Sequence, residues 1–287
     1  MDYGITFLYS TTSNRSILRE LAQAADELGY HSVWVGEHIA MPRDYRSTYP
    51  YSTDGQAEFP YDSDFTEAMV TLGFIAGVTD RVRLGTSVIP MITRDPLSMA
   101  KQAATVDRLS DGRLELGLGA GWCRDEAELL GHPHDHSAER MDEAIEIMRC
   151  AWSQPSFTFS GRFWSYPEVY VNPKPVQGRD VPIWIGGLGP KAVRTTIEHA
   201  TGNLVYGGPD EVRLAAEKLR ADRKDLRLWA PVGRGDDMVE RAKALCSAGA
   251  DLPILACPAT PADLTSVWVA DVLRDLDEFA TGVAAMG

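Results

Sequence analysis

His38 and Glu37 are the residues of this chain best suited to acid–base chemistry. They follow the apolar run Ser-Val-Trp-Val-Gly at 32–36, which has the composition of a buried strand. An imidazole exchanges a proton near neutral pH, so His38 is a candidate catalytic group; a histidine merely hydrogen-bonded in polar surroundings is the alternative. Glu37 is a second catalytic candidate. Because adjacent strand residues point to opposite faces, it can instead orient a neighbour.

Two glycine-rich segments are candidates for binding a cofactor. Gly117, Gly119 and Gly121 alternate, which leaves one face of the backbone open to a flat ring. We therefore predict cofactor contacts in the segment that contains Gly119, Ala120, Gly121 and Asp125. Tight packing of strands is the alternative explanation for these glycines.

The second glycine-rich segment opens a helix. Gly186, Gly187 and Gly189 precede Pro190, and free N–H groups at a helix start can hold phosphate, with Lys191 adding positive charge. A plain glycine turn before a helix that starts with proline explains the same residues. Arg94 and Arg234 are further possible anion contacts, or simply surface residues.

Two other segments have an unusual composition, but the sequence does not assign a role to either of them. His132, His134 and His136 have the density of a metal-binding tract, but they precede an expected surface helix, and we expect no metal there. The long loop at 40–62 is rich in aromatic residues, namely Tyr45, Tyr49, Tyr51, Phe59 and Tyr61. It could cover a substrate, join the core or contact another subunit.

Strand and helix patterns alternate along the whole chain and position these residues. Strands are predicted at 3–9, 31–36, 82–88, 113–118, 182–186, 203–206, 226–230 and 252–256. Helices are predicted at 14–28, 65–78, 95–109, 138–152, 190–200, 209–221, 236–248 and 261–279. Residues 155–176 interrupt the alternation and have the composition of a hairpin.

Eight such units predict an α/β fold, a (β/α)₈ TIM barrel with a hairpin insertion near 155–176. An open doubly wound sheet is the rival, but no Gly-x-Gly-x-x-Gly follows the first strand. We expect one domain over residues 1–287. Barrel enzymes hold their active sites at the C-terminal ends of the strands, where His38 and both glycine segments fall.

Composition narrows the class of partner. The 287 residues carry a net charge of −13, which disfavours nucleic acid and anionic membranes. The N-terminus shows no targeting pattern, and no apolar stretch is long enough to cross a membrane. Four cysteines without a Cys-x-x-Cys pair suggest free thiols. We therefore expect a cytoplasmic protein that acts on a small-molecule substrate.

Several segments together resemble a known family. They are Gly-Tyr-His-Ser-Val-Trp-Val-Gly-Glu-His (29–38), Leu-Gly-Thr-Ser-Val (84–88), Arg-Leu-Ser-Asp-Gly-Arg-Leu-Glu-Leu-Gly-Leu-Gly-Ala-Gly-Trp (108–122), Glu-Arg-Met-Asp-Glu-Ala (139–144) and Pro-Ile-Trp-Ile-Gly-Gly (182–187). In this order they resemble the luciferase-like monooxygenase superfamily, and most of all its branch that uses the deazaflavin F420. The resemblance covers residues 3–206. It then fades: Thr-Gly-Asn stands at 201–203, where members usually have Asp-Gly-Trp.

The resemblance implies roles for particular residues. It places His38 beside the ring of the cofactor and implies a non-prolyl cis peptide between Ser87 and Val88, against that ring. It also implies a homodimer through the early helices. Many users of deazaflavin have Asp-His where Glu37 and His38 stand, which leaves the role of Glu37 open. Some have an acid at the place of Trp122, which disfavours a sugar-phosphate dehydrogenase.

The leading hypothesis is therefore an F420-dependent oxidoreductase that moves a hydride between the deazaflavin and a small organic substrate. An FMN-dependent monooxygenase using reduced flavin and O₂ is the alternative. A barrel that has lost catalysis and acts as a binding protein is the third possibility.

Overall fold

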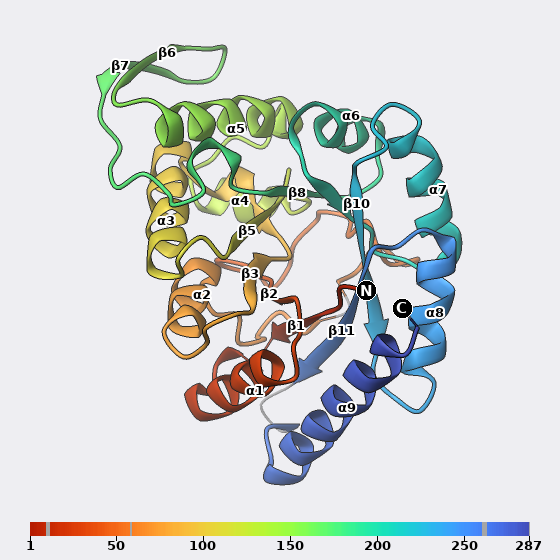
Figure 1. Cartoon of the computed structure of the whole chain (residues 1–287). Coiled ribbons are helices and arrows are strands. Elements are labelled where there is room, and N and C mark those ends of the chain that lie inside the picture. Colours follow the sequence, from red (N-terminus) through yellow and green to blue (C-terminus); the bar gives the residue numbers. More distant parts are fainter. Residues whose placement is uncertain (10–11, 58, 260–262, 287) are drawn as a thin grey trace.

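Eight strand positions form a closed parallel barrel in the part of the chain that the computed structural model describes, which is residues 1–9, 12–57, 59–259 and 263–286. Strand β1 pairs with both β2 and β11, and β3 pairs with β5, so the sheet closes on itself (Figure 1). The predicted TIM barrel is confirmed. Its strands are β1 (Gly4–Tyr9), β2 (Ser32–Val35), β3 (Arg83–Thr86) with its short continuation β4 (Ile89–Pro90), β5 (Leu114–Gly119), β8 (Ile183–Gly186), β9 (Gly202–Leu204), β10 (Arg227–Gly233) and β11 (Leu252–Ala259).

Helices surround the strands and follow the predicted alternation. They are α1 (Arg15–Glu27), α2 (Ala68–Ala76), α3 (Pro96–Leu109), α4 (Arg124–Leu129), α5 (Ser137–Ser153), α6 (Pro190–His199), α7 (Pro209–Arg220), α8 (Met238–Ala248) and α9 (Ser266–Ala284), with short 3₁₀ turns η2 (Met91–Thr93) and η3 (Gly178–Asp180). Helix α4 was not predicted. The predicted start of the last helix includes residues outside the described ones, and its end lies five residues beyond the predicted 279. None of the described helices has the length and apolarity that a membrane crossing requires.

Two departures from regular alternation lie where the chain was expected to be unusual. The predicted strand 82–88 is divided by a cis peptide between Ser87 and Val88, after which β4 continues along β5. The predicted insertion forms an antiparallel hairpin of β6 (Phe157–Ser160) and β7 (Ser165–Val169), which lies outside α5 in Figure 1. Both predictions are confirmed.

Three tryptophans fill the inside of the barrel. The ring of Trp34 lies 5.6 Å from that of Trp184 and 6.2 Å from that of Trp229, in edge-to-face contacts that aromatic pairs favour. Glycines make room for them: a Cβ at Gly85 would lie 2.2 Å from the Trp34 ring, and one at Gly202 would lie 2.6 Å from the Trp184 ring. The barrel is therefore solid in its middle, and any cavity must lie at one of its ends.

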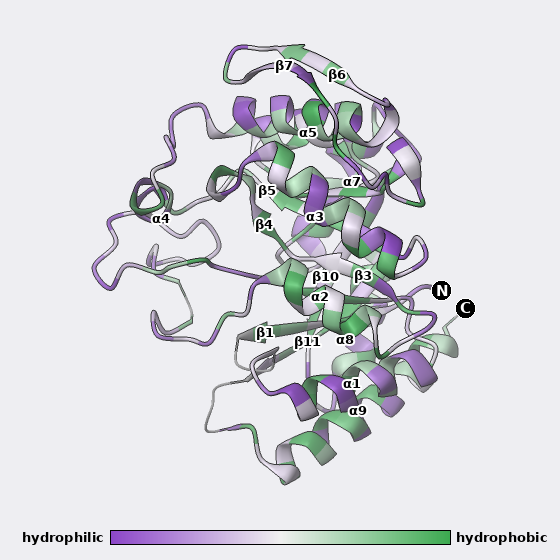
Figure 2. Cartoon of the chain, turned by 90° about the vertical axis from the view of Figure 1, so that its left-hand side faces the viewer, coloured by the Kyte–Doolittle hydropathy of each residue, from purple (hydrophilic) through white to green (hydrophobic). Residues whose placement is uncertain are grey.

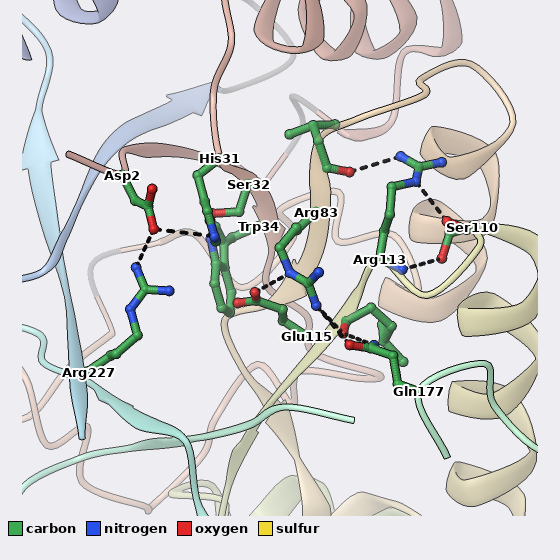
Figure 3. Close-up of polar contacts among 12 residues, drawn as sticks. Asp2, His31, Ser32, Trp34, Arg83, Ser110, Arg113, Glu115, Gln177 and Arg227 are labelled. Atoms are coloured by element: carbon green, nitrogen blue, oxygen red, sulfur yellow. Dashed lines mark hydrogen bonds and ion pairs between the residues drawn. The ribbon is translucent and has the colours of Figure 1, made fainter. Parts of the chain in front are cut away.

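Ion pairs cover the N-terminal end of the barrel (Figure 3). Asp2 accepts a hydrogen bond from Arg227 at 2.7 Å and lies 3.6 Å from Nε2 of His31, while Arg83 pairs with Glu115. Asp2 thus ties the start of the chain to β10 and to the residue before β2, and the Arg83–Glu115 pair joins β3 to β5. The side view in Figure 2 places the two termini at this end, and α4 at the opposite one. Residues at the N-terminal face of a barrel commonly serve stability, which leaves the α4 end for function.

Candidate functional site

A cavity of about 490 Å³ lies at the C-terminal ends of the strands. This size is typical of pockets that bind small molecules and cofactors. Its lining comes from the ends of β1, β2, β5 and β8, from the Ser87–Val88 segment and from the 40–62 loop. The described lining residues are Leu8, Gly36, Glu37, His38, Thr48, Tyr49, Pro50, Tyr51, Phe59, Phe65, Ser87, Val88, Pro90, Gly119, Ala120, Gly121, Trp122, His134, Gly186 and Tyr206.

His38 is held at this cavity by a buried carboxylate. Its Nδ1 lies 2.8 Å from Oε2 of Glu126, whose side chain is 1 % exposed. The other oxygen of Glu126, Oε1, accepts hydrogen bonds from the backbone N–H groups of Ile39 (2.7 Å) and Ala40 (3.2 Å). Because a carboxylate only accepts hydrogen bonds, Nδ1 of His38 carries the donated proton. In a neutral imidazole Nε2 is then the acceptor, and His38 is among the residues that line the cavity.

Glu37 also lies at the cavity wall, but both oxygens of its carboxylate have protein partners. One oxygen pairs with Arg94, and the other accepts the backbone N–H of Ala68 at 2.8 Å. The side chain is fully buried, and burial raises the pKa of Glu37 although the charge of Arg94 opposes this effect. Arg94 also binds Glu67 at 2.9 Å. These contacts fix the start of α2, and the catalytic role of Glu37 stays a prediction.

An aromatic wall surrounds His38, to which the 40–62 loop contributes Phe59 and Tyr49, while Phe65 and Trp122 come from outside the loop. The imidazole lies 5.2 Å from the ring of Phe59, 5.4 Å from that of Phe65 and 5.7 Å from that of Trp122. Tyr49 continues the wall, with its ring 5.1 Å from Trp122. The sequence left open whether this loop covers a substrate. Its side chains do line the cavity.

Ser87 and Val88 form part of the cavity surface, and neighbours hold the backbone there. The carbonyl oxygen of Ser87 accepts a hydrogen bond from the Tyr206 hydroxyl at 3.1 Å, and the Ser87 hydroxyl lies 3.2 Å from that of Thr6. Val88 packs against the tryptophan cluster inside the barrel. The cis peptide thus separates the solid core of the barrel from the open cavity.

The alternating glycines serve packing as well as the cavity. A Cβ at Gly117 would lie 1.8 Å from the carbonyl oxygen of Thr86, and one at Gly119 would lie 2.9 Å from Val88. Gly117 therefore permits close contact of β5 with the end of β3. Gly119, Ala120 and Gly121 do line the cavity, and their contact with a cofactor stays a prediction.

The structure directs Asp125 to the loop and not to the cavity. Its Oδ2 accepts hydrogen bonds from the hydroxyl of Ser47 (2.6 Å) and from the backbone N–H groups of Ser47 (3.0 Å) and Arg46 (3.1 Å). The bond from the Ser47 hydroxyl, with the others, lowers the pKa of Asp125 to about 2. The adjacent carboxylates Asp125 and Glu126 thus hold the same loop at two places.

The predicted phosphate segment starts beside the cavity. Gly186 lines the cavity, Gly187 has a positive φ of 100°, and α6 begins at Pro190 with no side chain capping it. A Cβ at Gly189 would have nothing within 4 Å, so the space in front of this helix is open. Lys191 is mostly exposed and pairs with Glu139 at 3.1 Å. The helix start fits phosphate, but the positive charge of Lys191 is already paired.

The remaining charged candidates lie elsewhere or have partners. Arg234 binds Asp275 at 2.7 Å, and Arg94 is a largely covered ion-pair partner of Glu37 rather than a surface residue. His134 lines the cavity, where its Nε2 lies 3.2 Å from the carbonyl oxygen of Gly121. Within the described residues, no three His, Cys, Asp or Glu side chains gather as metal ligands.

The important residue that sequence reasoning missed is Glu126. It stands next to Asp125, which was selected, and 88 residues from its partner His38. Helix α4 decides which carboxylate faces inward. Cys123 is the N-cap of this helix. In the first helical turn, Glu126 therefore points toward the barrel and Asp125 toward the loop. A prediction of this short helix would have given the signal.

Comparison with known proteins identifies the family of this chain. The family model described as luciferase-like monooxygenase matches residues 6–244. The chain belongs to this family. Its members among the matched proteins include both F420-dependent and flavin-dependent enzymes, so the chain is a luciferase-like oxidoreductase by family.

Curated relatives cover most of this chain. Uncharacterized protein Rv0953c of Mycobacterium tuberculosis is 34% identical over 82% of this chain and 80% of its own length. An F420-dependent glucose-6-phosphate dehydrogenase of Kineococcus radiotolerans is 28% identical over 78% of this chain and 61% of its own. The oxygenase component of a flavin-dependent trigonelline monooxygenase from Acinetobacter baylyi is 28% identical over 63% of this chain and 45% of its own.

Solved structures support the fold. The coenzyme F420-dependent tetrahydromethanopterin reductase of Methanopyrus kandleri aligns with a TM-score of 0.75 at 17% identity over 99% of both chains. The oxygenating constituent of 3,6-diketocamphane monooxygenase from Pseudomonas putida, in complex with FMN, aligns with a TM-score of 0.74 at 14% identity over 99% of both chains. At these identities the likeness concerns the barrel alone.

Proposed function

We propose that this protein is an F420-dependent oxidoreductase that transfers a hydride between the deazaflavin and a small organic substrate. The hydrogen bond between His38 and Glu126 carries the proposal. Moving a hydride to or from a carbon that bears oxygen requires a proton to move at that oxygen. An imidazole held by a buried carboxylate is well suited to manage that proton.

The residues present fit a flat cofactor with a phosphate-bearing tail. The cavity of about 490 Å³ lies in the size range of pockets that bind cofactors and small molecules. Gly186 connects the cavity to the start of α6, where uncapped N–H groups suit a phosphate. Ser87, Val88 and Gly119 to Gly121 would hold the ring. When bound, a deazaflavin accepts or donates a hydride.

The protein's own groups perform the remaining chemistry. His38 accepts at Nε2 the proton that leaves a substrate hydroxyl during oxidation, and it returns the proton during reduction. Glu126 keeps the ring in the required tautomer and stabilises the imidazolium that forms, as carboxylate partners of histidine do elsewhere. The rings of Phe59, Phe65 and Trp122 exclude water from this exchange.

An FMN-dependent monooxygenase is the second candidate. The matched oxygenase component from Acinetobacter baylyi, whose name states flavin dependence, favours it. In this reading the same aromatic wall would exclude water from the bound flavin.

Titration of the full chain with F420 and with FMN, each oxidised and reduced, tests the proposal. Tighter binding of F420, followed by substrate-dependent absorbance changes of the deazaflavin, is the expected result. Tighter binding of reduced FMN would replace the proposal with the monooxygenase. If neither cofactor bound, the barrel would be a binding protein without catalysis.

His38→Ala tests the assignment of the proton. We expect turnover to fall by about 10²–10⁴, with the Kd of the cofactor nearly unchanged, because general acid–base catalysis is commonly worth this much. His132→Ala is the matched control, since His132 is not among the residues that line the cavity. Wild-type turnover in His38→Ala would remove the proton-transfer role, and lost cofactor binding would make His38 a structural contact.

A further inference from the structure

The charges around the cavity point to a class of substrate. Among the described lining residues none is lysine or arginine, and the ionisable side chains other than tyrosine phenols are Glu37, His38 and His134. Glu37 is already neutralised by Arg94, which lies behind the wall with its side chain 12 % exposed. The guanidinium of Arg46 lies on Asp125, with its side chain 85 % exposed. The lining thus offers no ready countercharge for an anion.

The surroundings of His38 are apolar on several sides. Phe59, Phe65 and Trp122 all have ring centroids within 6 Å of the imidazole, and Tyr49 extends the wall beyond Trp122. Removing an ionised group from water into such surroundings is strongly unfavourable unless a partner compensates the charge. An uncharged ring or alkyl group incurs no such cost and buries apolar area instead.

We propose that the substrate is an uncharged alcohol or carbonyl compound with a flat or alicyclic apolar body. Its body lies against Trp122, Tyr49 and Phe59, and its single oxygen reaches Nε2 of His38. Phosphorylated and carboxylated substrates are rejected. Trp122 is the residue that determines this preference, because it contacts both His38 and Tyr49 and links the imidazole to the loop wall. This inference rests on the proposed function, because the ligand is a substrate only if the protein is an enzyme. The binding test below needs no cofactor.

The test measures binding of matched probes to the full chain by ligand-observed NMR. Benzyl alcohol and benzyl phosphate share one ring and differ in charge. Excess inorganic phosphate is present throughout, so that any phosphate site at α6 is occupied. We expect benzyl phosphate to bind at least about tenfold more weakly than benzyl alcohol. Equal or tighter binding of the phosphate would overturn the proposal.

Substitutions of Trp122 test whether this residue causes the preference for an uncharged ligand. Trp122→Arg should strengthen binding of benzyl phosphate and weaken that of benzyl alcohol, whereas Trp122→Phe should preserve the wild-type order. Tyr170→Arg is the matched control, because Tyr170 is 70 % exposed near the hairpin and does not line the cavity. If Trp122→Arg and Tyr170→Arg changed probe binding equally, the assignment to Trp122 would be wrong. The wild-type comparison stands even if a variant does not fold.

The outcomes separate the two proposals. If the probes show the expected order but neither F420 nor FMN binds, the proposed function is wrong and the preference for an uncharged ligand stands. If F420 binds and is reduced by a substrate, but benzyl phosphate matches benzyl alcohol, the proposed function stands and the substrate class is wrong.

Discussion

Replacing Glu126 by glutamine tests how the site controls His38. The amide oxygen of glutamine can keep the hydrogen bonds from Ile39 and Ala40, so that its NH₂ group faces Nδ1 of His38. Because an NH₂ group donates, Nδ1 must become the acceptor, and the proton moves to Nε2. The variant thus keeps the shape of the site but presents a donor to the cavity in place of a base.

The size of the effect follows from this change of tautomer. In a serine protease triad, the same carboxylate-to-amide change lowers kcat by about 10⁴. We expect kcat here to fall by about 10²–10⁴, which corresponds to about 2.7–5.4 kcal/mol in the activation barrier. Loss of a charge-assisted hydrogen bond should lower the free energy of unfolding by only about 1–2 kcal/mol.

Single-turnover kinetics, cofactor titration and nitrogen NMR of the labelled imidazole provide the assay. The expected pattern is a lower kcat, a nearly unchanged cofactor Kd and a change of tautomer in the His38 ring. Glu128→Gln is the control, because it removes the same charge two residues away on α4, where the side chain is half exposed and does not line the cavity. A wild-type tautomer together with wild-type kcat in Glu126→Gln would refute the positioning role, and so would an equal loss of kcat in Glu128→Gln.

Three further predictions concern the start of α6, the loop and the closed end of the barrel. Gly189→Asp should weaken cofactor binding by about tenfold, since it places a carboxylate where phosphate is expected, whereas Gly189→Ser should not; equal Kd values for both variants would remove α6 from the cofactor site. Asp125 stabilises the fold above its unfolded pKa of about 3.8, and this contribution is lost as the pH falls toward about 2. The difference in unfolding free energy between the wild type and Asp125→Asn should therefore be constant above about pH 4.5 and shrink below it; a difference that does not change with pH would contradict the assignment. Burial lowers the pKa of His31 from its usual 6.5, so the unfolded chain binds the proton more readily, and stability should fall as the pH drops below about 6.5. Urea unfolding of His31→Gln should show a flatter dependence between pH 7 and 5, and the same slope as wild type would exclude His31 as the cause.

The barrel could be predicted because its signal is local. Alternating strand and helix patterns, each a few residues long, indicate βα units, and eight such units are the number that closes a barrel of this kind. The position of His38 followed from the same logic, since it ends the second strand. These inferences needed only the order of residues along the chain.

The partners of the site residues were not predictable in the same way. Glu37 and Arg94 are 57 residues apart, and Lys191 and Glu139 are 52 apart. Such pairs depend on how helices pack around the barrel and not on any repeat in the sequence. The choice between Asp125 and Glu126 depended on the phase of a helix of six residues, which is too short to show a period.

The way in which the 40–62 loop is attached has a consequence for how its specificity can change. Asp125 and Glu126 hold it largely through backbone N–H groups, those of Arg46 and Ser47 at one point and those of Ile39 and Ala40 at the other. A backbone N–H is present whatever side chain a residue carries. The aromatic residues farther along the loop can therefore be exchanged while its attachment stays in place. A library that varies Tyr49 and Phe59 would sample new substrates without rebuilding the acid–base pair beneath them.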